Sequence, residues 1–285
     1  MVPLRGYLGS APSPSRCAGP SLSRKGRGVF AAIRKKAPDM IEQTVDIATR
    51  DGAMETFVCR PERGGKVPAI FLLMDAPGIR EELRDMTRRL ATVGYCVLLP
   101  NLYYRAGRDT LYGPDVLSEG SAEHQRMRAV RTRMTIPPAM EDVAALLDFA
   151  DRDEGVRKGA VGCHGYCMSG PYALAAAARY PARVAAAASF YGTWLVSDAV
   201  ESPHLSFAKV AGELYIACAE HDHLAPLPMV ETLRARFAEA GSPGEIELYP
   251  GAHHGFAFPE RKVYDKPAAE RHWERLIALY RRRLG

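Results

Sequence analysis

A cysteine stands where an apolar run ends and an alanine-rich helical pattern begins, in the segment Val161-Gly162-Cys163-His164-Gly165-Tyr166-Cys167-Met168-Ser169-Gly170. A nucleophile on a sharp turn between strand and helix needs small residues two places away, and Gly165 and Ser169 meet that need for Cys167. The start of the helix offers N–H groups and positive partial charge to the sulfur. This pattern predicts a nucleophile elbow at Cys167, although a free cysteine can also simply fill space in a core.

Two later loops hold groups that could activate this sulfur. Glu220-His221-Asp222-His223 follows one apolar run, and Gly251-Ala252-His253-His254-Gly255-Phe256 follows the next. A histidine would take the thiol proton, and a carboxylate would fix the ring tautomer and stabilise its cation. The chain order nucleophile, acid, histidine is that of triads built on a mostly parallel sheet. From these residues alone the acid is Asp222 or Glu220, and the base is His254 or His253.

The segments that must position these loops alternate between short apolar runs and helical patterns from Met40 onward. That alternation predicts an α/β fold of three layers, in which helices flank a mostly parallel central sheet. The expected strands are Ala69 to Met74, Tyr95 to Leu99, Gly159 to Cys163, Ala185 to Phe190, Leu214 to Ala219 and Ile246 to Tyr249. The expected helices are Glu81 to Val93, Pro138 to Asp151, Met168 to Tyr180, Pro228 to Ala240 and Ala268 to Arg283.

Two segments fall outside this alternation. Residues 1–39 are rich in Gly, Pro, Ser and Arg. Such a segment is a disordered basic tail, a transit peptide or a product of start-codon choice, and residues 40–285 then form one domain. The polar stretch from Arg105 to Thr135 is expected to form a lid or side wall over the site.

Composition narrows the class of protein. The 285 residues are 47% hydrophobic and 25% charged, which is typical of a globular protein, and no apolar run approaches the roughly 18 residues of a membrane span. The first 39 residues hold eight basic residues and one acidic residue, so the net charge of +5 leaves −2 for the remainder. These values argue against a membrane or nucleic-acid partner.

The cysteine pattern bears on compartment and cofactors. Six cysteines without a disulfide framework or paired CxxC spacing indicate a reducing, cytoplasmic location. His164 between Cys163 and Cys167 suggests a metal, but a structural zinc site needs about four ligands, and no second cluster is present. The sequence has no P-loop and no strand-following G-x-G-x-x-G, so no cofactor is expected.

From about Met40 to its end the chain resembles the dienelactone hydrolase family, or carboxymethylenebutenolidases, of the α/β-hydrolase superfamily. The matching motifs are Gly165-Tyr166-Cys167-Met168-Ser169-Gly170, Pro100-Asn101-Leu102-Tyr103, Asp222-His223-Leu224-Ala225-Pro226 and His253-His254-Gly255-Phe256-Ala257. This register selects Asp222 and His254 as the partners of Cys167.

The resemblance implies further site residues. Asp75 stands where the family has a Glu that contacts the resting cysteine, and the N–H groups of Met168 and Ala76 are expected to form the oxyanion hole. A carboxylate on the family's substrate is gripped by arginines, and Arg126 matches one of them.

The second family arginine has no counterpart, because the sequence after the histidine motif reads Phe256-Ala257-Phe258. That departure favours a less anionic or more apolar ester. Tyr166 and Phe256 are the other expected substrate contacts.

These observations predict an enzyme that opens a lactone or small carboxylic ester through an acyl-thiol intermediate. Its partner is a small-molecule substrate, and the chain is expected to be a monomer or homodimer. Two other functions fit the same residues: a non-catalytic relative that binds a small ligand, or an acyltransferase or peptidase with the same triad.

Overall fold

A computed structural model describes residues 40–108 and 112–285, so the prediction for residues 1–39 lies outside the described chain. The strands are β1 (Met40–Thr49), β2 (Gly52–Pro61), β3 (Ala69–Leu73), β4 (Cys96–Pro100), β5 (Val161–Tyr166), β6 (Val184–Phe190), β7 (Glu213–His221) and β8 (Gly244–His253). The α-helices are α1 (Glu81–Thr92), α2 (Ala122–Arg131), α3 (Ile136–Arg152), α4 (Gly170–Arg179), α5 (Leu227–Glu239) and α6 (Lys266–Leu284). Three 3-10 helices are η1 (Tyr104–Ala106), η2 (Cys167–Ser169) and η3 (Pro203–Lys209).

The strands form one sheet in the order β1-β2-β4-β3-β5-β6-β7-β8. Neighbours from β4 to β8 run parallel, whereas β2 is antiparallel to both β1 and β4. The prediction of a mostly parallel sheet is confirmed, and β1 and β2 are additions that the apolar runs do not predict. Strands β3, β4 and β5 are buried along their whole length, as parallel strands covered on both faces must be.

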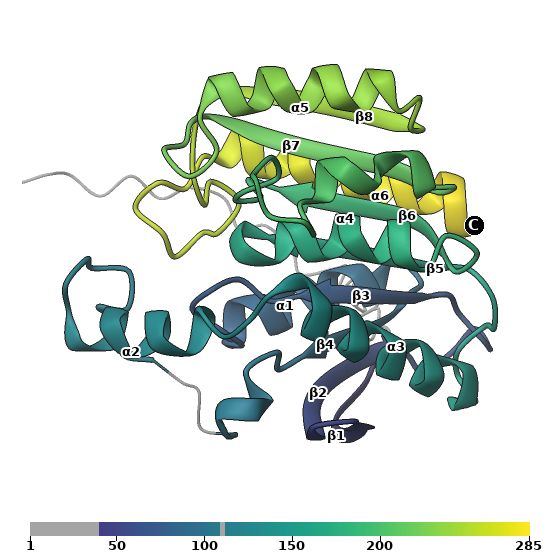
Figure 1. Ribbon diagram of the computed structural model, residues 1–285. Helices are drawn as coiled ribbons and strands as arrows, with labels where there is room; N and C mark the ends of the chain where they lie inside the picture. Colours follow the sequence, from purple (N-terminus) through teal and green to yellow (C-terminus); the bar gives the residue numbers. More distant parts are fainter. Residues whose placement is uncertain (1–39, 109–111) are drawn as a thin grey trace, which may run out of the picture. The chain divides into compact units, whose positions relative to one another are not determined.

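Helices cover both faces of the sheet (Figure 1). Helices α1 and α6 share one face, where Arg89 of α1 pairs with Glu270 of α6, and α3 packs beside α4 on the other face. Side-chain caps mark where two of the α-helices begin. The Ser121 side chain accepts a hydrogen bond from the His124 N–H at the start of α2, and Asp265 does the same for Ala268 at the start of α6. Within the described ranges, every helix is too short or too polar to cross a bilayer.

The parallel strands point their carboxyl ends toward one edge of the sheet. The loops after β3, β5, β6, β7 and β8 therefore lie along that edge, which is where open α/β sheets carry their sites. These loops hold Asp75, Cys167, residues 191–194, Asp222 and His254 respectively.

Candidate active site

The backbone at Cys167 is bent into a conformation that non-glycine residues rarely adopt. Its φ is 54°, and β5 ends at the preceding residue. A Cβ on Gly165 would overlap the carbonyl oxygen of Ser169, so only glycine fits there. The Ser169 hydroxyl accepts a hydrogen bond from the Tyr166 N–H at 3.0 Å and donates to the Leu73 carbonyl at 2.9 Å. These contacts hold the turn tight and raise the cysteine above the end of the sheet.

Cys167 differs from the other cysteines in its access to solvent. Of the five cysteines within the described residues, Cys167 alone is not buried. Burial raises the pKa of the Cys96 and Cys218 thiols to about 12, which keeps those thiols protonated. Among these five cysteines, a thiol reagent in solution therefore has access to the Cys167 sulfur alone.

The acid and histidine loops bring Asp222 and His254 together. The Asp222 Oδ2 lies 2.7 Å from the His254 Nδ1, and the other carboxylate oxygen accepts the Leu224 N–H at 2.9 Å. The Asp222 side chain has no exposed surface, and the ring of Tyr191 packs against the His254 ring with centroids 5.1 Å apart. Asp222 thus orients the ring so that its Nε2 is left for another group.

The electrostatic surroundings of His254 favour its charged form. Burial lowers the pKa of His254, but the charge of Cys167 and hydrogen bonds to Asp222 and Cys167 outweigh it and raise the pKa to about 9. The sulfur and the ring are therefore electrostatically coupled.

The alternative candidates in both loops lie elsewhere. Glu220 accepts the Gly251 N–H at 2.7 Å in an exposed position, which ties the two loops together. His253 packs against His221 with ring centroids 4.9 Å apart. Neither arrangement joins these residues to the Asp222–His254 pair.

Tyr103 contacts both residues that are expected to supply oxyanion N–H groups. Its hydroxyl donates to the Ala76 carbonyl oxygen at 2.8 Å and lies 3.2 Å from the Met168 sulfur. The Asn101 side chain accepts the Tyr103 N–H at 3.0 Å and so shapes the turn that carries this tyrosine. The sequence includes Tyr103 only as the last residue of a family motif and does not predict this contact. That motif was the one feature that could have pointed to it.

Asp75 is the centre of a buried ion cluster. Its carboxylate accepts a hydrogen bond from Arg80 at 2.6 Å and another from Arg261. Arg80 also reaches Glu82 at 2.7 Å, and both guanidinium groups lie 4.6 Å from the centre of the Phe258 ring. Nothing in the sequence pattern pointed to Arg261. The expected contact of Asp75 with the resting cysteine stays a prediction, since its partners in this structure are arginines.

The three expected substrate contacts have different surroundings. Arg126 is half exposed, pairs with Glu123 at 3.2 Å and lies 4.8 Å from the centre of the Tyr112 ring. Tyr166 is fully buried, with its hydroxyl 2.7 Å from the His272 Nε2. Phe256 is also fully buried and stacks on Tyr249. None of these contacts joins the three residues to one another.

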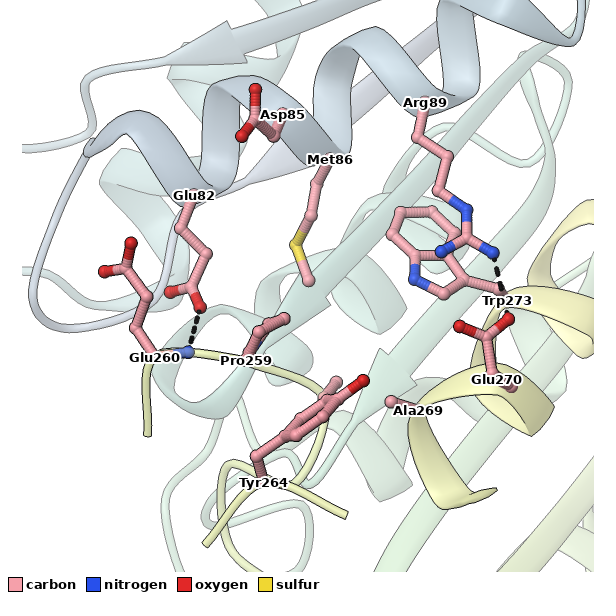
Figure 2. Close-up of a pocket in the computed structure, with 11 residues that line it drawn as sticks. Glu82, Asp85, Met86, Arg89, Pro259, Glu260, Tyr264, Ala269, Glu270 and Trp273 are labelled. Carbon is pink, nitrogen blue, oxygen red and sulfur yellow. Dashed lines mark hydrogen bonds and ion pairs between the residues drawn. The ribbon is translucent and has the colours of Figure 1, made fainter. Parts of the chain in front are cut away.

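Cavities flank the elbow and also occur away from it. One of about 350 Å³ includes Met168, and one of about 250 Å³ includes Pro77, Arg80 and Arg261. Figure 2 shows a third, of about 230 Å³, between α1 and α6, where Glu82 accepts the Glu260 N–H. The linings of these three cavities include neither Cys167 nor His254, and the first reaches the elbow through Met168.

A mostly parallel sheet, with an elbow cysteine and an acid–histidine pair in loops at its carboxyl edge, defines the α/β-hydrolase class. The sequence matches the dienelactone hydrolase family over residues 54–284, and the chain belongs to that family. It is a hydrolase of the kind that acts on lactones and carboxylic esters.

Individual relatives agree with this assignment. A Synechocystis protein assigned as a carboxymethylenebutenolidase is 26% identical over 252 residues, which cover 86% of this chain and 98% of that one. An Escherichia coli K12 protein with the same assignment is 26% identical over 269 residues, covering 88% and 94%. A crystal structure from Klebsiella pneumoniae, described as a dienelactone hydrolase, has a TM-score of 0.75 at 24% identity and covers 85% of this chain and 98% of its own. That last likeness shows the fold.

Proposed function

We propose that this protein hydrolyses a lactone or small carboxylic ester with Cys167 as nucleophile, His254 as acid and base, and Asp222 as the residue that orients the ring. The observation that carries the proposal is the Asp222–His254 pair at 2.7 Å, electrostatically coupled to the cysteine of the elbow. The proposed triad draws one group from each of three separate loops, and simple core packing does not require a buried carboxylate to orient a histidine.

In the first half of the reaction the Cys167 thiol gives its proton to His254, and the resulting thiolate attacks the carbonyl carbon. A C–S bond forms, and the carbonyl π electrons move to oxygen, where the N–H groups of Met168 and Ala76 stabilise the oxyanion. The intermediate collapses and the C–O bond breaks. The leaving alkoxide takes a proton from the His254 imidazolium, and the acyl group remains on sulfur.

In the second half neutral His254 acts as a general base. It takes a proton from water, whose oxygen attacks the thioester carbon and forms a second oxyanion. Collapse of this intermediate breaks the C–S bond and releases the acid, and the departing Cys167 sulfur takes the proton back from His254, which restores the resting enzyme. With a lactone, the carboxylate and the hydroxyl of the product stay on one molecule.

The arginines support a substrate of low negative charge near the sulfur. Arg80 and Arg261 are already paired with Asp75, and Arg126 lies on a half-exposed face beside Glu123. A substrate carboxylate would compete with these acids for every one of the three. A neutral ester has no such competition.

The proposal is tested by p-nitrophenyl acetate hydrolysis with Cys167→Ala, His254→Ala and the control Cys163→Ala, which changes a buried cysteine of β5, the strand that leads to Cys167. We expect both site variants to lose about 1,000-fold or more in kcat/KM, while the control keeps its activity. Rapid acid quenching followed by mass spectrometry should find the acetyl group on the peptide that contains Cys167.

Equal activity of Cys167→Ala and wild type would contradict the proposed mechanism. Absence of ester turnover, together with alkylation of Cys167 no faster than that of a free thiol, would instead favour a non-catalytic ligand-binding protein.

A further inference from the structure

The cavity of about 350 Å³ beside the elbow has a mainly apolar wall. Its apolar lining includes Met134, Ile136, Met168, Pro171, Tyr172 and Trp194, and its two charged lining residues, Arg131 and Glu201, have opposite sign. The Tyr172 hydroxyl donates to the Met134 carbonyl at 2.9 Å, so the polar end of this ring is already satisfied. Cavities of about 150 Å³ admit benzene when their walls are apolar. This cavity therefore has room for an aromatic ring.

Two residues of the cavity wall are connected to Cys167 through the backbone. Met168 follows Cys167 directly, and the Thr193 N–H donates to the Cys167 carbonyl oxygen at 3.2 Å. Trp194 is the next residue after Thr193. Part of the cavity wall is thus formed by residues that adjoin Cys167, or its hydrogen-bond partner Thr193, in the chain.

Trp194 combines two unusual features. Its φ is 52°, and within the described residues the other non-glycine residues with positive φ are Cys167 and Tyr191, which both lie in the site. Backbone strain of this kind concentrates at functional positions. The side chain is 49% exposed although it is a large aromatic group, and Arg131 lies 4.5 Å from the ring centre on the wall of the same cavity.

We infer that this cavity is a specificity subsite that binds a neutral apolar group, such as an aromatic ring, on the substrate of Cys167. Trp194 forms its outer wall and Met168 joins it to the reacting carbonyl. The inference rests on the proposed function, since it takes Cys167 as the reacting atom, and it adds the class of substituent that the substrate carries. When an aromatic group enters the cavity, its apolar surface is removed from water. This burial lowers the barrier that kcat/KM reports for that substrate relative to an acetate ester.

Alkylation of Cys167 tests the subsite without requiring hydrolysis. A Cys17→Ser background removes the cysteine outside the described residues, and the rates with iodoacetamide and N-phenyliodoacetamide are compared. We expect the parent protein to prefer the phenyl reagent. Trp194→Ala, and Ala199→Phe, which fills the mouth of the cavity, should each lower that preference about 10-fold. The control Leu205→Ala removes another exposed apolar side chain, one that does not line the cavity, and should leave the preference unchanged.

Fluorescence separates this inference from the catalytic proposal. The chain has two tryptophans, so Trp273→Phe leaves Trp194 as the reporter. Quenching of Trp194 by 4-nitroacetanilide that saturates, and that is lost in Ala199→Phe, supports the subsite even if no ester is hydrolysed. Equal preference for the two alkylating reagents in the parent and both variants, with no saturable quenching, would overturn it even if Cys167 is catalytic.

Discussion

Asp75, in the loop after β3, forms an ion pair with Arg261, which lies 186 positions later in the chain. The Asp75 side chain has no exposed surface, and Arg80 completes its pairing at 2.6 Å. Because Ala76 follows Asp75, this cluster also holds the loop that carries one of the proposed oxyanion donors. The pair therefore links the chain segment after the histidine loop to the first loop of the site.

Replacing Asp75 by Asn should destabilise the fold. The change leaves two guanidinium groups without their common partner, and breaking a buried ion pair in this way costs about 3–5 kcal/mol. Urea unfolding measures the change in the free energy of unfolding. The matched control is Asp85→Asn, an exposed carboxylate paired with Arg88, which should cost about 1 kcal/mol or less. Equal losses in the two variants would contradict this account of the cluster.

The identity of the acid can be tested directly. Asp222→Asn should reduce kcat/KM for p-nitrophenyl acetate by about 1,000-fold or more, because an amide stabilises neither the required tautomer nor the imidazolium. Glu220→Gln removes the neighbouring carboxylate, whose partner is the Gly251 N–H, and should retain activity. The reverse result would assign the acid to Glu220.

The raised pKa of His254 predicts a pH-dependent stability. Between 6.5 and about 9 the folded protein holds a proton that the unfolded chain releases. The contribution of His254 to stability is thus complete below pH 6.5 and is lost as the pH rises through 9. The free energy of unfolding should fall by up to about 1.4 kcal/mol per pH unit in this window. Urea unfolding at several pH values gives the free energy of unfolding as a function of pH. Its slope in this window should be smaller for His254→Gln than for wild type, and equal slopes would rule out a raised pKa.

The elbow should not tolerate a side chain at Gly165. A Cβ there would overlap the backbone of Ser169, so Gly165→Ala must shift the turn, and overpacking of this kind costs about 1–3 kcal/mol or more. Gly113→Ala is the control, because Gly113 does not have a left-handed backbone and the nearest atoms to an added methyl group belong to the flexible side chains of Glu123 and Asp115, at 3.2 and 3.3 Å. The melting temperature and the activity should both fall further in Gly165→Ala than in the control variant. Similar losses in the two variants would mean that the turn can relax around the added methyl group.

Tyr103 is expected to act as a positioning residue. Tyr103→Phe removes the hydroxyl that contacts Ala76 and Met168, and loss of one hydrogen bond corresponds to about 3- to 10-fold in rate. The loss should fall on kcat and leave KM unchanged, because the oxyanion exists only during reaction. Tyr104→Phe is the control, since that hydroxyl contacts Asp142 and Thr49 instead, and it should change stability but not kcat. A purely structural role for Tyr103 would change kcat and KM together or neither.

The sequence predicts the parallel strands because they are buried on both faces and read as continuous apolar runs, as in Ala69–Leu73. It does not predict β1, in which Ile47 is the one fully buried residue and exposed residues interrupt the pattern. It also starts β5 too early and ends it at Cys163, whereas the strand runs from Val161 to Tyr166. Gly162 and Gly165 weaken the strand signal there, although close packing and the elbow require them.

For the site, chain order together with the motif register leads to Cys167, Asp222 and His254, because each follows a strand at the same edge. Chain order and motifs do not predict the ion cluster around Asp75, because no periodic pattern links Asp75 to Arg261. The conformation of Trp194 is equally hidden, because a positive φ at a non-glycine residue depends on tertiary contacts rather than local preference.

The placement of each site residue on a different strand has a consequence for how the protein folds. Cys167 follows β5, Asp222 follows β7 and His254 follows β8, so the residues meet only after strands distant in sequence have paired. Such nonlocal pairing is slow, because the entropy of closing long loops must be overcome first. During refolding, enzymatic activity should therefore return no earlier than the pairing of β5 through β8, so the recovery of catalysis reports when this nonlocal part of the sheet has formed.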